Sequence, residues 1–304
     1  RRRLAKACCA STYPSATHRS ADMCDLLVAL PCATGSHTIF AKNSDRPPDE
    51  VQIVEIVEPR TESSTRCTHI AVEPFDRPTL RCVISRPEWG WGAEHGVNEA
   101  GLALGNATIY TTLDPRPFPD ALTGMDIVRL ALERCANALD AVALITVLIE
   151  THGQGGSGHA PLSTRRPYWN SFLIADPTDA WVVETSGREW ESRQVRDVWA
   201  TSNRTTIDTF DVHRHPRQPV ASLVDPRLDA SREVLSTRPV TLDAMRRHLA
   251  SHGMSEDGWD VCMHVDGVEC TTASLIVELP HGSAPRVLMA QGSPCVTQYH
   301  RIHL

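Results

Sequence analysis

The chain has 304 residues, 41% of them hydrophobic, and a formal net charge of −7 at pH 7. This length and apolar content are enough to bury a large core, in one large domain or two small ones. The negative charge and the absence of a basic run after the first few residues argue against a nucleic-acid surface, and no apolar tract is long enough to cross a bilayer. We therefore expect a small or neutral substrate.

Residues 1–23 differ from the rest of the chain, because they are rich in Arg, Ser and Ala, hold one acidic residue and show no apolar period. We expect them to lie outside the fold. No apolar stretch follows the arginines, which excludes a secretory signal. Three explanations remain: an organellar transit peptide, a propeptide cut before Cys24, or upstream sequence with Met23 as the true start. We favour the last, in which removal of the initiator Met leaves Cys24 at the N-terminus.

From Cys24 onward the chain alternates short apolar runs with turn residues. CDLLVALP and HTIFAKN, joined by ATGS, predict a hairpin, and VQIVEIV alternates strictly as a strand does. Further predicted strands lie at 67–73, 80–86, 101–110, 170–176, 180–186, 198–203, 261–267, 272–280 and 286–292. The short connections between them predict antiparallel pairing.

Between about 120 and 151 the apolar period becomes helical. One face holds Met125, Val128, Leu132 and Cys135, and a second helix continues through 139–149 until His152-Gly153 can end it. Shorter helices are predicted at about 225–235 and 241–251, each opened by an Asp or Thr suited to capping. Strands on both sides of a helical block predict layered sheets with helices outside.

The stretch 153–167, GQGGSGHAPLSTRRP, has no periodicity. We interpret it as a flexible surface loop; the alternative is a loop over an active site, where binding residues often lie. Its glycines do not open a clear helix and lack phosphate-loop spacing, so we expect no nucleotide cofactor.

The ten cysteines are widely spread and never spaced C-x-x-C, which fits neither a zinc ribbon nor a disulfide scaffold. They indicate a reducing compartment. We therefore expect a cytoplasmic protein, or an organellar one if residues 1–23 act as a transit peptide.

Several histidines have spacings that can in principle bind a metal ion. His248 and His252 are four residues apart but lack the Glu of the zinc-protease helix, and His213 and His215 are flanked by Arg and Pro as in a loop. We interpret these four as surface histidines and His264, in an apolar run, as a core or pocket histidine. The sequence thus predicts no metal site and no cofactor.

An N-terminal Cys24 would carry nucleophile and base in one residue, because its neutral α-amine can take the proton of its own thiol. The alternative is an ordinary strand cysteine. Amide hydrolysis also needs donors aimed at the developing oxyanion and a group that orients the amine. Asn side chains and backbone N–H groups suit the first task, and an Asp suits the second.

The stretch CDLLVALPCATGSHTIFAKNSDRPPDEVQ resembles the opening of secernins and dipeptidase A peptidases. SRPEWGWGAEHGVNEAGLALGN, GMDIVRLALERC, GQGG, NSFLIAD, ETSGREW, TSN, CMHVDG and TTASLIVELP match in the same order and cover nearly everything after residue 23. These proteins are N-terminal nucleophile (Ntn) hydrolases, related to penicillin V acylase and bile salt hydrolase. The resemblance implies an α+β fold for residues 24–304, an αββα sandwich with two antiparallel sheets between helical layers.

The same resemblance implies roles for individual residues. Cys24 is the nucleophile, Asp45 binds its amine, Asn106 belongs to the oxyanion hole, and Asn203 positions amine and substrate. Residues implied on the substrate side or just behind it are Lys42, where the wider superfamily often has an Arg, and Asn43, Arg46 and Asn170. Read without the family, Asn43 and Ser44 suit a turn, Asn106 a strand end and Asp45 a loop cap.

Two features depart from the family pattern. TTASLIVELP lacks the late-strand basic residue that the wider superfamily often uses, and the chain ends soon after GSPCVTQYHRIHL, where relatives usually continue. The C-terminus is therefore interpreted as shortened.

The resemblance implies a cysteine hydrolase of small amides, foremost a dipeptidase acting through a thioester. One alternative is a secernin-like protein with little hydrolysis and a regulatory or secretion-linked binding role. Another is an acylase for non-peptide amides. The sequence gives no oligomeric state.

Overall fold

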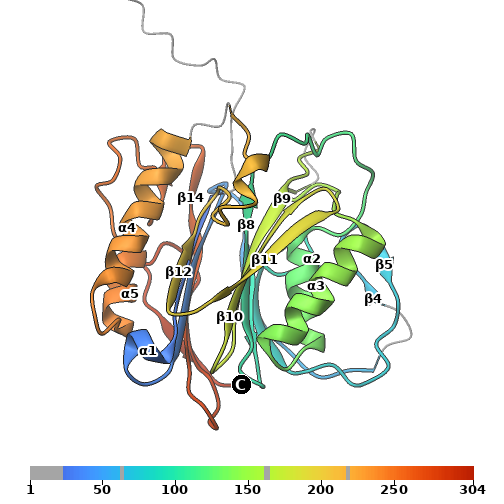
Figure 1. Cartoon of the computed structure of the whole chain (residues 1–304), viewed down its shortest axis with the longest axis horizontal. Coiled ribbons are helices and arrows are strands. Elements are labelled where there is room, and N and C mark those ends of the chain that lie inside the picture. Colours follow the sequence, from blue (N-terminus) through green and yellow to red (C-terminus); the bar gives the residue numbers. More distant parts are fainter. Residues whose placement is uncertain (1–22, 62–64, 161–164, 217–219) are drawn as a thin grey trace, which may run out of the picture.

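The computed structural model describes residues 23–61, 65–160, 165–216 and 220–304, with the backbone alone at 220 and 221. These residues form four layers, in which two sheets face each other and helices cover the outer face of each (Figure 1). Residues 1–22, most of the segment expected outside the fold, lie outside the described residues. No helix in the described ranges is long and apolar enough to span a membrane.

The first sheet has the order β12-β1-β2-β14-β15-β16, with β13 also paired to β14. Its strands are β1 (Cys24–Ala29), β2 (Thr38–Arg46), β12 (Val198–Thr201), β13 (His264–Val265), β14 (Glu269–Leu279), β15 (Arg286–Ala290) and β16 (His300–Ile302). Every pairing is antiparallel, and the predicted hairpin is β1-β2, whose connection holds the short helix α1 (Pro31–Thr34).

The second sheet has the order β11-β10-β9-β8-β7-β6-β3 and is also antiparallel throughout. Its strands are β3 (Gln52–Val57), β6 (Cys82–Pro87), β7 (His95–Asn98), β8 (Ala103–Ile109), β9 (Trp169–Ala175), β10 (Ala180–Ser186) and β11 (Glu189–Val195). A separate small ribbon pairs β4 (Thr65–Arg66) with β5 (Ala71–Val72).

Side-chain alternation along β1 divides the core into layers. Leu26 and Val28 pack in the cluster between the two sheets, whereas Leu27 and Ala29 pack in the cluster under the outer helices. Successive side chains of a strand point to opposite faces, so a central strand covered on both sides must be apolar on both. This explains why CDLLVALP reads as a continuous apolar run.

The predicted helices are present. α2 (Gly124–Arg134) and α3 (Ala138–His152) cover the second sheet, and α4 (Asp225–Ser236) and α5 (Leu242–Leu249) cover the first (Figure 1). Gly153, at φ 74°, ends α3 as predicted, and Thr241 caps α5 through the N–H of Ala244. Asp225 is no cap, because a π-helical turn, η2 (Val220–Val224), runs directly into α4.

The interpretation of 153–167 as a flexible surface loop is wrong for its first part, and 161–164 lie outside the described residues. Residues 153–156 and Gly158 are buried. A Cβ on Gly155 would lie 2.1 Å from the carbonyl oxygen of Pro119, so only glycine permits this close backbone approach. The glycine-rich composition thus reflects tight packing.

Three further predictions need correction. The strand expected at 67–73 shrinks to β5, because Thr68 instead donates to Asp126 at the start of α2. His248 is buried on the inner face of α5, 2.8 Å from the hydroxyl of Ser231. His264 is exposed rather than in the core. The strands β7, β11 and β16 had no clear periodic signal.

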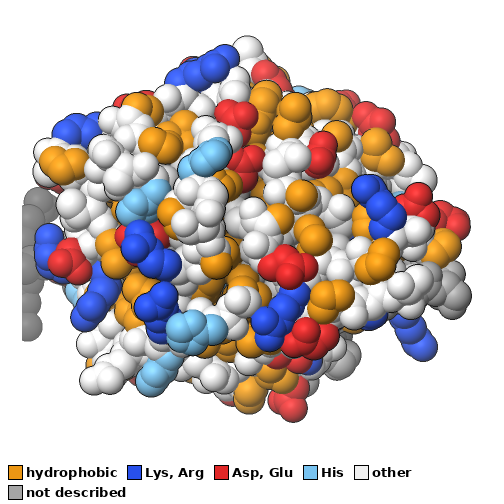
Figure 2. Space-filling view, turned by 90° about the horizontal axis from the view of Figure 1, so that it is seen from below, with side chains coloured by type: hydrophobic (Ala, Val, Ile, Leu, Met, Phe, Trp, Pro, Cys, Tyr) orange, Lys and Arg blue, Asp and Glu red, His pale blue; other side chains and the backbone are white. Residues whose placement is uncertain are grey.

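The lower end of the molecule carries α1 and the C-terminus (Figure 1). Figure 2 shows this end with basic, acidic and hydrophobic side chains lying together. Because α1 follows β1, strand β1 begins at the opposite, upper end, and Cys24 lies there.

Candidate active site

Cys24 is the first residue of β1, a strand that lies between β2 and the edge strand β12 of the first sheet. It is paired directly with Ser44, and its side chain packs in the cluster between the sheets. Directly opposed residues of antiparallel strands point to the same face, so the hydroxyl of Ser44 lies beside the thiol. Only 3% of Cys24 is exposed.

The backbone nitrogen of Cys24 is held by a polar cluster. It donates to Asn203 Oδ1 at 2.9 Å, and the other end of that amide, Nδ2, donates to the carbonyl of Thr108 at 3.1 Å. Asn203 follows β12, so it lies beside the start of β1 in the sheet. The structure thus brings Asn203 and Cys24 into direct contact.

Arg227, from the first turn of α4, completes this cluster. Its guanidinium donates to Asn203 Oδ1 at 2.9 Å and to Asp25 Oδ2 at 2.6 Å, and neither charged side chain is exposed. We did not predict Arg227 from the sequence. A signal was present, since Arg227 shares the buried face of α4 with Leu228, Ser231 and Leu235.

Met23 directly precedes β1 and packs against the fold instead of standing apart from it. Its N–H donates to Glu269 Oε1 at 2.8 Å, and its carbonyl accepts the N–H of Asp45 at 3.0 Å. Its side chain is buried against Val224 and Met263. While Met23 is attached, the nitrogen of Cys24 is therefore a peptide nitrogen within a packed strand.

Asp45 lies opposite Met23 at the end of β2. Its Oδ1 accepts from Thr271 at 2.6 Å, whereas its buried Oδ2 has no hydrogen-bond partner among the described residues. Burial raises the pKa of Asp45 well above its ordinary value, nearby Asp25 raises it further, and Arg227 opposes the shift. A cationic donor placed beside Oδ2 would therefore stabilise the ionised form of Asp45.

Lys42 and Glu94 lie on the thiol side of Cys24. Lys42 Nζ is buried and donates to the carbonyl of Glu94 at 2.7 Å and to its Oε2 at 3.3 Å. Gly105 of β8 makes room for this side chain, because a Cβ there would lie 2.8 Å from Lys42 Cδ. Burial raises the pKa of the Cys24 thiol far above its ordinary value, and the charge of Lys42 is the largest opposing influence.

His95 is a further titratable group on this side that we did not predict. Its Nδ1 lies 3.1 Å from the hydroxyl of Ser44. Burial lowers the pKa of His95 well below its ordinary value, and the charge of Lys42 lowers it further. The imidazole is therefore neutral at pH 7, next to the residue that pairs with Cys24.

Asn106 and Asn170 form a network on the other face of the second sheet. Asn106 Nδ2 donates to Asn170 Oδ1 and Asn170 Nδ2 donates to Gln154 Oε1, both at 2.9 Å. Gly124, the first residue of α2, packs against both asparagines, and a Cβ there would lie 1.8 Å from Asn170 Oδ1. Since α2 covers the outer face of β8, the structure does not bring the Asn106 side chain to the thiol.

Asn43 and Arg46 are both buried, and each makes contacts with other parts of the fold. Asn43 alternates with Lys42, faces the helices, and donates to the carbonyls of Leu249 and Val261 at 2.8 and 2.7 Å. Arg46 is 1% exposed; it pairs with Glu50 at 2.6 Å and donates to the carbonyl of Gly158 at 2.8 Å. Asn43 ties β2 to the helical layer, and Arg46 fastens the buried glycine-rich loop.

This arrangement separates two environments around one residue. The positive charge of buried Lys42 lowers the pKa of the Cys24 thiol against the effect of burial, and the nitrogen of Cys24 donates to an amide oxygen backed by an Asp–Arg pair. A nucleophile and a proton acceptor on one residue can both be oriented in this way. The geometry is suited to acyl transfer once the nitrogen is a free amine.

A family model described as Peptidase family C69 matches residues 24–224, which is more than half of the chain and begins at Cys24. Among solved structures, the fold resembles a Caenorhabditis elegans ortholog of N-acylethanolamine-hydrolyzing acid amidase, with a TM-score of 0.50 and 12% identity over 83% of this chain and 91% of that one.

It also resembles a mutant of conjugated bile acid hydrolase from Clostridium perfringens, with a TM-score of 0.52 and 11% identity over 92% of this chain and 97% of that one. A second variant of that hydrolase gives a TM-score of 0.51 at 10% identity, with the same coverage. At these identities the likeness concerns the fold, which is the αββα sandwich of the Ntn hydrolases, as predicted.

Proposed function

Because the chain belongs to peptidase family C69, the family of the secernins and dipeptidase A peptidases, we propose that it hydrolyses dipeptides through Cys24 after Met23 is removed. At the coarser level it is a cysteine hydrolase of the Ntn superfamily. The choice of dipeptides rests on the family, and the observation that carries the proposed role of Cys24 is the contact of 2.9 Å between its backbone nitrogen and Asn203 Oδ1.

Loss of Met23 turns the nitrogen of Cys24 into an α-amine that is already oriented. Asn203 Oδ1 accepts one of its protons, as it accepts the peptide N–H in the uncleaved chain. Asp45 lies across the strand pair from Met23, and its Oδ2 has no partner among the described residues, so it can accept a second. The pair fixes the amine so that its lone pair can reach the thiol.

The chemical step then follows from these positions. The neutral amine takes the thiol proton, and the thiolate attacks the carbonyl carbon of the substrate amide. The amine, now an ammonium group, returns the proton to the leaving nitrogen, which departs and leaves a thioester on Cys24. Water, deprotonated by the same amine, hydrolyses this thioester.

Lys42 supplies the positive charge for this reaction. Its buried ammonium group opposes the effect of burial on the pKa of Cys24, which means that it stabilises the thiolate. The same charge favours the oxyanion that forms beside the thiol, since a fixed cation in a buried site acts without solvent reorganisation. Glu94 holds Lys42 in place through two acceptors.

Met23 blocks this chemistry while it is attached. A peptide nitrogen cannot act as a base, and the buried thiol has a raised pKa. We therefore expect the chain that retains Met23 to be inactive and the chain that begins at Cys24 to be active.

The test compares two purified proteins, one beginning at Cys24 and one retaining Met23, with N-termini verified by mass spectrometry. Release of amino acids from a dipeptide panel is expected only from the first, and Cys24→Ala should abolish it. Hydrolysis that persists in Cys24→Ala contradicts the assignment. A free Cys24 with no turnover of any dipeptide or acylated amine favours the secernin-like binding role.

A further inference from the structure

Four potential metal ligands, three of them exposed and one buried, gather outside the set of side chains assigned to the thiol and amine chemistry of Cys24. They are His252, Cys262, His264 and Cys295, and their ligand atoms all lie within 4.8 Å of one another. Three separate segments contribute them: the loop after α5, the chain entering β13, and the turn after β15. The sequence spacing is irregular, which is why no zinc motif was visible.

We propose that these residues form a Cys2His2 site for Zn²⁺. Zinc in structural sites prefers four ligands from cysteine and histidine in tetrahedral geometry. A tetrahedron with Zn–S of about 2.3 Å and Zn–N of about 2.0 Å separates its ligand atoms by about 3.3 to 3.8 Å. His264 Nε2 lies 3.5 Å from Cys262 Sγ and 3.2 Å from Cys295 Sγ, close to these edges.

The remaining ligand is within reach of the same centre. The ring of His252 stacks on that of His264 with 5.1 Å between their centroids. His252 and Cys295 are both exposed, so their side chains can turn to close the remaining gap without disturbing the core. Soft thiolates combined with imidazoles select zinc over magnesium or calcium, which prefer oxygen ligands.

The backbone presents two of these ligands together. Cys262 and His264 are two residues apart in an extended segment, so their side chains share one face. Between them, Met263 faces the opposite way and packs against Met23 and Val224. This alternation places both ligands on the face opposite Met263, where Cys262 is buried and His264 is exposed.

A metal ion at this position would be connected through two hydrogen bonds to Asp45, at the end of the sheet where Cys24 lies. Met263 donates its N–H to Thr271 Oγ1 at 2.8 Å, and Thr271 donates to Asp45 Oδ1 at 2.6 Å. Zinc held by Cys262 therefore fixes the residue that orients Thr271 and, through it, Asp45. The proposal of the metal site itself does not depend on the hydrolase mechanism.

The test uses the full chain, reduced and freed of metal, and titrates it with Zn²⁺ and with Co²⁺ as a spectroscopic probe. We expect about one metal ion per chain, with thiolate-to-cobalt charge-transfer absorption and a higher melting temperature in the metal-bound protein. Cys295→Ser and His252→Ala change exposed ligands, so both variants should fold, yet lose the cobalt absorption and the melting shift.

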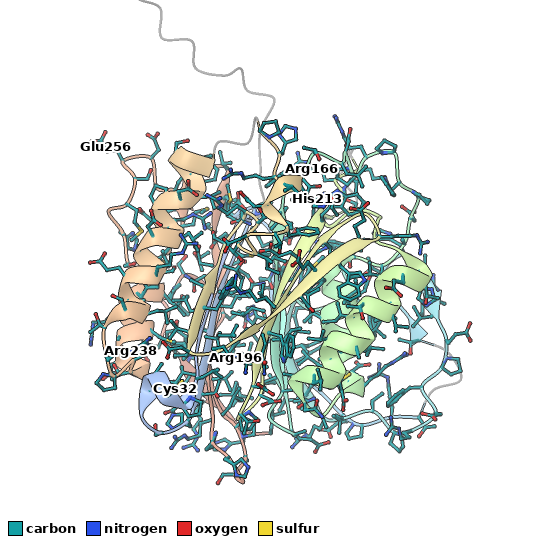
Figure 3. The ribbon with its side chains drawn as sticks, viewed as in Figure 1. Cys32, Arg166, Arg196, His213, Arg238 and Glu256 are labelled. Carbon is teal, nitrogen blue, oxygen red and sulfur yellow. The ribbon has the colours of Figure 1, made fainter. Side chains whose placement is uncertain are left out.

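Matched controls alter residues of the same type elsewhere. Cys32→Ser changes an exposed cysteine at the lower end of the molecule. Glu256, which marks the loop between His252 and Cys262, lies at the upper end (Figure 3). His281→Ala changes an exposed histidine. Both controls, and Cys24→Ala, should keep full metal binding.

The proposal is overturned if the reduced chain binds no zinc, or if Cys295→Ser and His252→Ala bind it as the controls do. It is equally overturned if the isolated protein contains a Cys262–Cys295 disulfide and the reduced form gains neither cobalt absorption nor melting temperature.

Discussion

Arg227 donates to Asn203 Oδ1 at 2.9 Å, and this same oxygen accepts the backbone N–H of Cys24. Two donors converging on one atom identify it as the amide oxygen and fix the orientation of the side chain. Because Arg227 also pairs with Asp25, the orientation of Asn203 depends on a buried ion pair behind it. Catalytic geometry and stability are therefore linked in this cluster.

Removing one partner of the buried Asp25–Arg227 pair should destabilise the fold more than removing both charges. Arg227→Met should lower the free energy of unfolding by about 3 to 5 kcal/mol, because it leaves Asp25 as a buried charge without its partner. The double variant Asp25→Asn with Arg227→Met should recover part of this loss. Urea denaturation of the three proteins measures both effects. Equal losses in the single and double variants would show that the ion pair is not the cause.

Asn203 is predicted to act in catalysis. Asn203→Ala should lower kcat by about 10²-fold, because the amine of Cys24 loses the acceptor that orients it, and misplacing a catalytic group by about 1 Å can cost that much. Asn106→Ala should lower kcat much less and mainly reduce stability, since its side chain lies on the α2 face with Asn170. Steady-state kinetics with one dipeptide compares the two. A larger kinetic effect at Asn106 would assign the oxyanion role to that residue.

Alternation and apolar period predicted strands, helices and layered sheets, because these patterns depend on neighbouring residues, whereas the αββα sandwich was implied by the resemblance to the Ntn hydrolases. The same resemblance implied roles for Cys24 and Asn203, which the structure brings into contact. The sequence could not show that Asn43 and Asn106 point to the outer faces of their sheets. A shift of one residue in the strand register moves every side chain to the opposite face of the sheet. Arg227 was missed because pairing with Asp25 joins residues that are 202 apart in the chain.

His95 offers a direct test of which group is the base. If the α-amine of Cys24 takes the thiol proton, His95→Gln should keep kcat within about tenfold, whereas loss of a true general base costs about 10²- to 10⁴-fold. The pH profile of kcat should also keep its shape. A lost ionisation together with a large fall in kcat would place His95, through Ser44, in the proton path.

The raised pKa of Glu184 predicts how the free energy of unfolding changes with pH. Its carboxylate is buried and accepts from Thr206 and Ile207, yet burial raises its pKa from 4.5 to about 7. Below pH 4.5 both the folded and the unfolded chain hold this proton. Between pH 4.5 and 7 only the folded chain holds it, so the unfolded state binds fewer protons and the free energy of unfolding falls as the pH rises.

The stabilising contribution of Glu184 is therefore complete below pH 4.5 and lost as the pH passes through about 7. The full loss is about 3 kcal/mol. Glu184→Gln cannot titrate, so the unfolding free energy of the natural chain minus that of the variant should decrease by up to this amount between about pH 4 and pH 8. Urea denaturation of both proteins at matched pH values measures the difference and cancels the titration of all other groups. A difference that stays constant would mean that Glu184 is already ionised in the fold, stabilised by the donors from Thr206 and Ile207.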